Sequence, residues 1–143
     1  IISTKKGKVM SDYKRLMSLA NDMRAFSHVP YSNFRVGAVL VGKSGKEYTG
    51  CNVENAAFSP TICAERTAFA KAVSEGEKEF ECIAIVGGRS GETSPLCAPC
   101  GVCRQVMAEF CDDDFKVILG TPDDFKVYTL KEILPLTFTS KEL

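Results

Sequence analysis

The chain has 143 residues, with 18 lysines and arginines balanced by 18 aspartates and glutamates, and it contains seven cysteines. This length is enough for one hydrophobic core, so we expect a single domain over residues 1–143. A nucleic-acid-binding protein normally carries a basic excess, and a membrane-spanning helix needs roughly 20 apolar residues. The sequence has neither feature, which argues against nucleic acid and membrane partners and favours a small, weakly charged ligand.

The cysteines and the first residues indicate a compartment. An odd number of cysteines, with no secretory segment at the start of the sequence, is typical of reduced thiols rather than a disulfide framework. We therefore expect a cytoplasmic protein. Lys5, Lys6 and Lys8 make the start of the chain basic, and residues 1–10 are expected to form a flexible, solvated arm.

The first half of the sequence predicts one helix and a pair of strands. Apolar residues at helical spacing predict a helix that begins at a cap formed by Ser11 and Asp12 and ends near Ser27. Two strands, over 34–41 and 47–52, follow with a short turn between them. So short a connection predicts a hairpin.

The middle of the sequence predicts two more helices around a buried strand. Thr61 is the expected N-cap of a helix that ends near Ser74. The continuous apolar run over 82–86 predicts a strand buried on both faces, followed by a loop over 87–98. Pro99 suits the first position of the next helix.

The last predicted elements set the fold class. Strands over 116–119 and 125–129 are joined by about five residues, which is too short for a parallel crossover, so this pair should be antiparallel. A short helix over 130–134 then stops at Pro135. The predicted order is α-β-β-α-β-α-β-β-α, which indicates an α/β fold, a three-layer α-β-α sandwich with a mixed five-stranded sheet.

Two cysteine motifs at predicted helix starts carry the chemistry. They are Cys63-Ala64-Glu65 and Pro99-Cys100-Gly101-Val102-Cys103. Three thiolates can hold Zn²⁺ and leave its fourth coordination position to water, which distinguishes a catalytic zinc site from a structural one. Glu65 lies two residues from the first expected ligand, close enough to handle a proton of that water, although a first-turn glutamate also favours the helix dipole. A P-C-x-x-C spacing with a nearby non-ligand glutamate is typical of zinc deaminases.

Cys97 leaves other metal sites open. The spacing of Cys97, Cys100 and Cys103 is also that of an iron–sulfur run, and together with Cys63 it would make a closed four-thiolate zinc site without room for water. Neither gives a purpose to the separate Cys-Ala-Glu motif, so we expect Cys97 to be a free loop thiol. The remaining cysteines are expected in the core: Cys51, Cys82 and Cys111.

Two arginines directly follow these motifs, and the only histidine lies far from them in the sequence. Three thiolates make a zinc centre more negative than one with a histidine ligand, which should reduce its acidity. Arg66, directly after Glu65, either offsets this by donating to a thiolate or is an ordinary surface arginine of the helix, and Arg104 is a weaker candidate for the same role. His28 is expected to be a loop residue or a cation at a helix end rather than a metal ligand.

Four blocks of the sequence resemble the small cytidine deaminase family, whose members have one domain per subunit. They are Tyr31-Ser32-Asn33-Phe34-Arg35-Val36-Gly37-Ala38, Asn52-Val53-Glu54-Asn55, Cys63-Ala64-Glu65-Arg66-Thr67-Ala68 and Pro99-Cys100-Gly101-Val102-Cys103-Arg104-Gln105. The resemblance covers nearly the whole chain, from about Tyr31 to Phe138. The last two blocks mark the wider zinc deaminase superfamily, and the Asn-Val-Glu-Asn block is more specific to nucleoside substrates.

The resemblance implies a role for each matching residue. The Zn²⁺ ligands would be Cys63, Cys100 and Cys103. Glu65 would shuttle the proton, Arg66 would donate to a ligand thiolate and Phe34 would pack against the base. Asn52 and Glu54 would hydrogen-bond the ribose hydroxyls. The substrate-binding set would be Phe34, Asn52, Glu54, Ala64 and Phe138.

The resemblance also implies an assembly and a reaction. The family is usually a homotetramer in which a C-terminal phenylalanine, here Phe138, reaches a neighbour's site. Phe58 departs from the family, because many members carry there a tyrosine whose hydroxyl binds the sugar across a subunit boundary. The implied reaction is zinc-dependent hydrolysis of cytidine and 2′-deoxycytidine to uridine and 2′-deoxyuridine in pyrimidine salvage. The alternatives are deamination of another aminopyrimidine nucleoside, such as a nucleoside antibiotic, editing of nucleic acid, and a structural zinc or iron–sulfur module.

Overall fold

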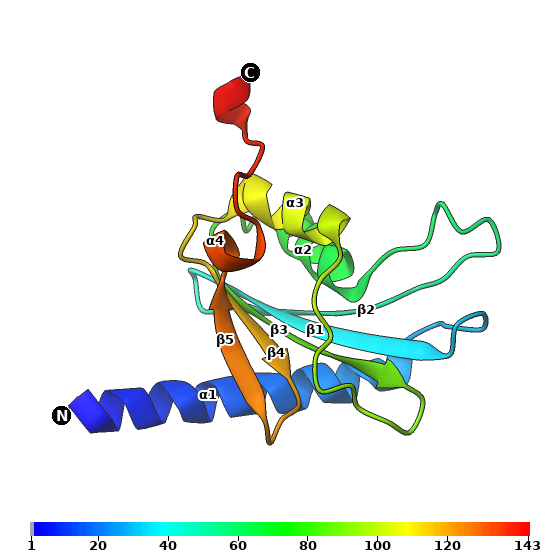
Figure 1. The fold of residues 1–143 in the computed structure, drawn as a ribbon, viewed down its shortest axis with the longest axis horizontal. Coiled ribbons are helices and arrows are strands. Elements are labelled where there is room, and N and C mark those ends of the chain that lie inside the picture. Colours follow the sequence, from blue (N-terminus) through cyan, green and yellow to red (C-terminus); the bar gives the residue numbers. More distant parts are fainter. Residues whose placement is uncertain (1) are drawn as a thin grey trace.

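The computed structural model describes residues 2–143 and contains one five-stranded sheet (Figure 1). The strands are β1 (Phe34–Gly42), β2 (Glu47–Cys51), β3 (Phe80–Arg89), β4 (Lys116–Gly120) and β5 (Phe125–Thr129), in the spatial order β2-β1-β3-β4-β5. β3 runs parallel to β4, whereas the other neighbouring pairs are antiparallel. The expected α/β class with a mixed five-stranded sheet is confirmed, and so is the β1–β2 hairpin.

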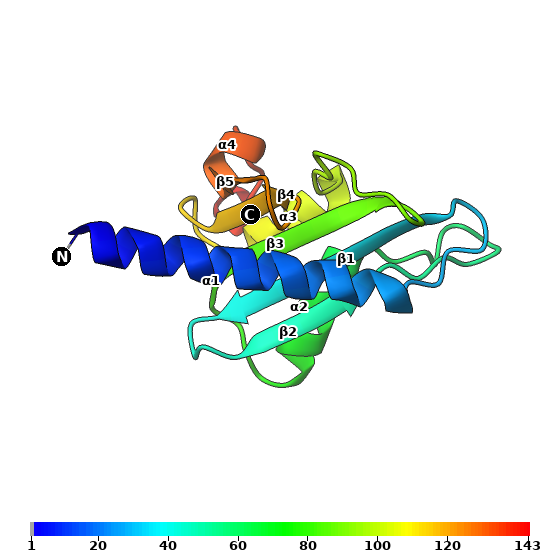
Figure 2. The same cartoon turned by 90° about the horizontal axis from the view of Figure 1, so that it is seen from below.

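Helices cover both faces of this sheet. α1 (Ile2–Met23) lies along one face, while α2 (Ala64–Ser74) and α3 (Gly101–Phe110) lie on the other (Figures 1 and 2). α4 (Leu130–Ile133) follows β5 at the α3 side, and short 3-10 turns occupy Arg24–Phe26 and Ser140–Glu142. No helix within residues 2–143 is long and apolar enough to span a membrane.

The buried strand β3 explains the two helical layers. Its side chains alternate between two hydrophobic clusters, because successive residues of a strand point to opposite faces. Ile83 and Ile85 pack with α2 and α3, whereas Cys82, Ala84 and Val86 pack with α1. All five are almost fully buried. A strand buried on both faces needs a helical layer on each of them.

The first helix differs from its prediction at its start. It begins at Ile2 rather than at a cap formed by Ser11 and Asp12, so residues 2–10 continue the helix instead of forming a separate arm. This stretch contains no proline, and Gly7 is its one glycine, the residue type with the lowest helix propensity after proline. The helix ends at Met23, and a 3-10 turn completes the predicted span to Ser27.

Three predicted boundaries near the cysteine motifs were wrong. Cys63, not Thr61, is the N-cap of α2, because Ile62 pairs with Val53 and keeps the chain extended up to the cysteine. Cys100 is the N-cap of α3, which leaves Pro99 outside the helix. β3 extends to Arg89 instead of ending before residue 87, because its last residues pair with the start of β1.

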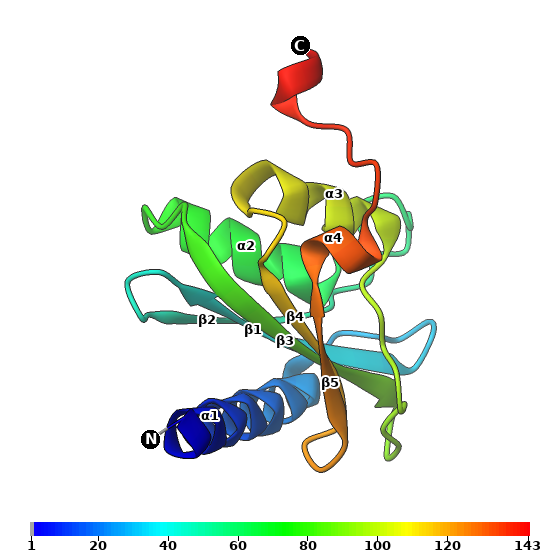
Figure 3. The same cartoon turned by 60° about the vertical axis from the view of Figure 1, so that its left-hand side comes forward.

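The chain ends in a segment that leaves the domain. After α4 the backbone runs past α3 and projects away from the sheet (Figure 3). Leu136, Phe138 and Leu143 in this segment are exposed. The amide Nε2 of Gln105, on α3, donates to the carbonyl oxygen of Phe138 at 2.9 Å and holds one point of the segment to the domain.

Candidate active site

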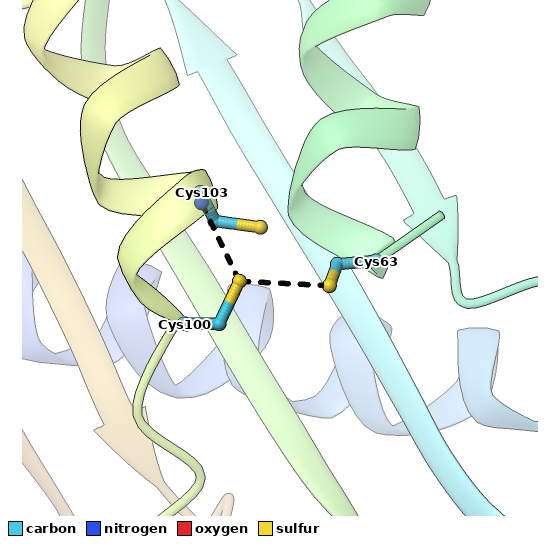
Figure 4. A group of neighbouring side chains, drawn as sticks. All are labelled: Cys63, Cys100 and Cys103. Atoms are coloured by element: carbon cyan, nitrogen blue, oxygen red, sulfur yellow. Dashed lines mark hydrogen bonds between the residues drawn. The ribbon is translucent and has the colours of Figure 1, made fainter. Parts of the chain in front are cut away.

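Three cysteine thiols meet where the N-termini of α2 and α3 come together (Figure 4). Cys63 and Cys100 are the N-cap residues of the two helices, and Cys103 lies in the first turn of α3. The three Sγ atoms lie within 4.8 Å of one another, and those of Cys63 and Cys100 are 3.8 Å apart. Two predicted motifs separated by 33 residues of sequence therefore form one cluster.

The cluster has the size that zinc requires. Zn–S bonds of about 2.3 Å in a tetrahedral arrangement place the sulfurs about 3.8 Å apart, which matches the distance between Cys63 and Cys100. Both helix N-termini also direct positive dipole ends toward the thiols, which favours thiolates. Cys97 lies outside this group of thiols. Three protein ligands leave one tetrahedral position for water or substrate.

The Cys97 thiol instead packs on the sheet at Gly87. A Cβ atom at residue 87 would lie 2.4 Å from the Sγ of Cys97, so this approach requires glycine. Burial is the main cause that raises the pKa of Cys97, to about 11. Its position on the sheet, outside the group of three thiols, argues against the closed four-thiolate site.

Hydrogen bonds tune the thiols of the cluster. The pKa of Cys63 is lowered to about 5, first by a hydrogen bond from Cys103 and then by one from Arg66. The Nη2 atom of Arg66 lies 3.5 Å from the Sγ of Cys63. The prediction that Arg66 donates to a thiolate agrees with this contact. Arg104, the second candidate, instead donates to the carbonyl oxygens of Pro99 and Ile133.

A buried carboxylic acid lies beside the thiols. Glu65 is the second residue of α2 and is only 4% exposed. Burial raises the pKa of Glu65 to about 7, with the negative charge of Cys63 as a smaller cause. An acid with a pKa near neutrality can both accept and release a proton at physiological pH, as a general acid–base catalyst must.

Close packing of α2 on the edge strand β2 sets the position of this acid. A Cβ atom at Gly50 would lie 2.3 Å from the carbonyl oxygen of Ala64 and 2.8 Å from the backbone nitrogen of Ala68. The missing side chain therefore lets the first turn of α2 contact the strand directly. Ala64, expected in the substrate-binding set, is the first residue of this helix and is fully buried.

The side chains of Asn52 and Glu54 make local hydrogen bonds in the single chain. Asn52 accepts from the backbone N–H of Val36 and donates to the carbonyl oxygen of Phe34, both at 2.9 Å. Oε1 of Glu54 accepts from the backbone N–H groups of Tyr31 and Ser32. Hydrogen bonds from Ser32 are the main cause that lowers the pKa of Glu54, so its carboxylate is ionised at neutral pH. An amide and a carboxylate each keep further hydrogen-bonding capacity for a ligand.

The aromatic residues of the predicted site lie in different surroundings. Phe34 is the first residue of β1 and is partly buried. Phe58 is exposed and meets the ring of Tyr31 edge-on, with 5.9 Å between the ring centroids. Phe138 lies on the projecting C-terminal segment and is 59% exposed. The only histidine, His28, has an exposed side chain and pairs through its backbone with Val53.

The sequence pattern of a known family, the cytidine and deoxycytidylate deaminase zinc-binding region, matches residues 10–120. The chain belongs to this family. Its matched span includes the three clustered thiols, Glu65 and Arg66. The family's metal is Zn²⁺, which agrees with the geometry of the thiols.

Individual deaminases are similar over most of their length. A cytidine deaminase from Sporosarcina psychrophila is 44% identical over 92% of this chain and 95% of its own. The crystal structure of cytidine deaminase from Burkholderia pseudomallei is 42% identical and superposes with a TM-score of 0.79, covering 87% of this chain and 97% of its own. A more distant relative, the blasticidin-S deaminase of Bacillus cereus, is 30% identical over 73% of this chain and 76% of its own.

Sequence reasoning missed two arginines next to this deaminase site. Arg24 donates to backbone carbonyl groups at the start of β1 and the end of β3, and Arg35 donates to the carbonyl oxygens of Arg24 and Ser27, which follow α1. A signal for Arg24 was present, because it lies four residues after Ala20, on the helix face that packs against the sheet. A cation on that apolar face is unusual and needs polar partners inside the protein.

Proposed function

We propose that this chain hydrolyses the 4-amino group of cytidine and 2′-deoxycytidine, giving uridine or 2′-deoxyuridine and ammonia. The observation that carries the proposal is the buried Glu65, whose pKa is about 7, next to three thiols at zinc spacing. Deamination of cytosine needs both a nucleophilic water and a proton donor for a poor leaving group. This arrangement supplies a group for each task.

Each residue of the site has its own role in the proposed reaction. Cys63, Cys100 and Cys103 would hold Zn²⁺, which, when bound, supplies the Lewis acidity that makes water a nucleophile at neutral pH. Glu65 accepts a proton from the attacking water and delivers it to N3 of the pyrimidine. A C–O bond forms at C4 as its amino group becomes a leaving group. Glu65 then takes the remaining proton of that water from the hydroxyl group on C4 and passes it to the amino nitrogen, the C–N bond breaks, C4 becomes a carbonyl carbon and ammonia leaves.

The nucleoside would be held by the two segments that lead into the site. Asn52 and Glu54 are proposed to bind the ribose hydroxyls, and Phe34 to pack against the base. Ala64 is proposed to contact the base through the backbone at the start of α2. The carboxylate of Glu54 is already ionised and held by Tyr31 and Ser32, so it can accept from a sugar hydroxyl at little ordering cost.

Ammonia release from cytidine by the purified protein tests this function. We expect release by the parent protein and loss of at least about a hundredfold in kcat for Glu65→Gln, with zinc retained. Glu75→Gln is the matched control, because Glu75 is an exposed C-cap residue at the far end of the same helix. Blasticidin S serves as the comparison substrate. Preference for it over cytidine, or a kcat of Glu65→Gln close to that of the parent protein, would refute the assignment.

We further propose that four copies of the chain assemble, with sites shared between subunits. An apolar groove between α2 and α3 supports this assembly, because Arg66 is its one charged lining residue among the described side chains. The other lining residues are Ile62, Phe69, Ala70, Val73, Val106 and Phe110. Exposed apolar grooves of this kind are typical of interfaces. The projecting segment with the exposed Phe138 is suited to reach a neighbouring copy.

Mixing two impaired variants tests the shared site. Glu65→Gln keeps the C-terminal segment but loses the acid–base group, whereas Phe138→Ala keeps the acid and loses the ring. If Phe138 completes a neighbour's site, mixed assemblies will regain activity above the sum of the separate variants. A mixture with only summed activity, or a stable active monomer in sedimentation, would contradict the proposal.

A reduced compartment fits the same chemistry. All seven cysteines are free thiols in the structure, and three of them must remain reduced to bind zinc. We propose a cytoplasmic role in pyrimidine salvage, where free nucleosides are the substrates. Cell fractionation with activity measurements would test the location.

A further inference from the structure

Arg24 is a buried cation whose partners are mostly backbone carbonyl groups. It is 9% exposed, and among residues 2–143 no carboxylate lies within ion-pair distance of it. Instead the Nε atom donates to the carbonyl oxygen of Arg35 at 3.0 Å. Nη2 donates to the carbonyl oxygens of Gly88 and Arg89 at 3.2 Å each, and to that of Glu92. A guanidinium presents five donors in a rigid fork, so it can bind several carbonyl groups at once.

On one side these bonds hold the strand end that carries Phe34. Asn52 hydrogen-bonds to the carbonyl oxygen of Phe34 and to the N–H of Val36. The side chain of Arg24 donates a hydrogen bond to the carbonyl oxygen of the residue between them, Arg35. Arg35 in turn donates from Nη1 to the carbonyl oxygen of Arg24 at 3.2 Å. Three successive residues at the start of β1 are thus fixed by two side chains.

On the other side the bonds hold the start of the loop that leads to the thiol cluster. Gly88, Arg89 and Glu92 lie at the end of β3 and directly after it. This loop continues to Cys97, which packs on Gly87, and then to the metal-ligand position Cys100. One guanidinium therefore joins the proposed base-binding strand to the loop before the second cysteine motif.

We propose that Arg24 is a positioning residue, which sets the start of β1, where the nucleoside base would bind, against the β3–α3 loop that leads to the zinc ligands. The inference rests on the proposed function, because it takes Phe34 and Asn52 as substrate-binding residues. Without Arg24, four carbonyl groups lose a shared donor, and the two segments are held together less tightly, by the pairing of β1 with β3. Substrate binding then weakens more than the chemical step does, because Glu65 and Cys63 lie on α2 and have no bond to Arg24.

Steady-state kinetics of zinc-loaded Arg24→Met and Arg24→Lys test the proposal. We expect Arg24→Met to raise KM for cytidine by about tenfold or more while kcat falls by less than about threefold, since misplacement of a binding group is costly. Arg24→Lys keeps the positive charge, so it should fold. It lacks the planar guanidinium group that donates to several carbonyl groups, so its KM should lie between those of the parent protein and Arg24→Met. Lys71→Met is the control, because Lys71 also joins a helix to a strand carbonyl group, that of Thr49, away from the loop.

The outcomes separate positioning from a purely structural role. A structural role would lower activity in proportion to the folded fraction, measured by circular dichroism, and leave KM at the parent value in both variants. That result overturns the proposal. If Arg24→Met does not fold, Arg24→Lys decides, and an unchanged KM in this variant also overturns the proposal. Asn52→Ala is measured beside them. An unchanged KM in Asn52→Ala would instead refute the proposed base-binding strand, and no turnover by the parent protein would refute the substrate.

Discussion

At the scale of single residues, Arg66 controls how easily the thiol cluster is protonated. Its hydrogen bond is one of the causes that lower the pKa of Cys63 to about 5. Protons compete with zinc for a thiolate, so a lower thiol pKa keeps the metal bound at lower pH. Removing Arg66 raises the pKa of Cys63, and protonation then begins at a higher pH. We expect Arg66→Gln to raise the midpoint pH of zinc release by about half a unit to one unit.

A chromophoric zinc chelator added across a pH series measures this midpoint. Lys71→Gln is the matched control, because Lys71 lies on the same helix and its side chain bonds to Thr49 rather than to a thiol. The control should release zinc at the same pH as the parent protein. A midpoint in Arg66→Gln that is unchanged or shifted to lower pH would contradict the assigned effect on Cys63.

Cys97 tests whether three thiols or four form the metal site. Its thiol packs on Gly87 outside the cluster, and burial keeps it protonated at neutral pH. Cys97→Ala should therefore retain one zinc ion per chain and lose only about 1 kcal/mol of unfolding free energy from the small cavity. Elemental analysis and urea unfolding measure both quantities. Cys100→Ala is the contrasting variant and should lose zinc; loss of zinc from Cys97→Ala would support the closed site.

At the scale of elements, the contact between β2 and α2 depends on one absent side chain. A Cβ atom at Gly50 meets backbone atoms of Ala64 and Ala68, which cannot rotate away as a side chain can. Gly50→Ala should lower the unfolding free energy by about 1 to 3 kcal/mol through overpacking. Gly101→Ala is the control, because nothing lies within 4 Å of a Cβ atom there. Urea denaturation compares the two, and equal stabilities would refute the close-packing argument.

The limits of sequence reasoning are also clearest for the elements. Apolar residues at helical spacing predicted α1 and a continuous apolar run predicted β3, because burial leaves a direct pattern in the sequence, whereas cap, turn and proline signals marked most of the other elements. Helix starts were missed where a tertiary contact decided them. Thr61 is a good N-cap residue, but its neighbour Ile62 pairs with Val53 and delays the helix to Cys63. That pairing joins distant segments and has no local signal.

In the candidate site, too, residues with a local sequence pattern were predicted and residues placed by tertiary contacts were missed. The metal ligands and Glu65 were predicted because zinc chemistry demands fixed residue types at fixed spacing. Arg24 has no such motif, and its role arises from where the ends of β1 and β3 meet. Every residue has a backbone carbonyl group, so a residue that binds such groups is not accompanied by particular residue types and can be recognised only from the fold. Sequence reasoning therefore finds the reacting groups before it finds the groups that position them.

At the scale of the whole molecule, the proposed tetramer would cover the apolar groove between α2 and α3 with a partner surface. Val102 lies on α3 beside this groove and is 58% exposed in the single chain. A charge there has little to disturb within one chain, so Val102→Glu should change the unfolding free energy of the subunit by less than about 0.5 kcal/mol. It should nevertheless separate the proposed tetramer, because an unpaired charge is costly in an interface.

Sedimentation velocity at several protein concentrations tests this difference between assembly and folding. We expect the parent protein to sediment as a tetramer, and Val102→Glu to sediment as smaller, folded species with reduced activity, since Phe138 can no longer reach a neighbour's site. Val127→Glu is the matched control, because Val127 is also exposed but lies on the edge strand β5, away from the groove. It should remain a tetramer. Dissociation of the control alone would move the interface to the sheet edge, and a tetrameric Val102→Glu would show that assembly does not use the groove.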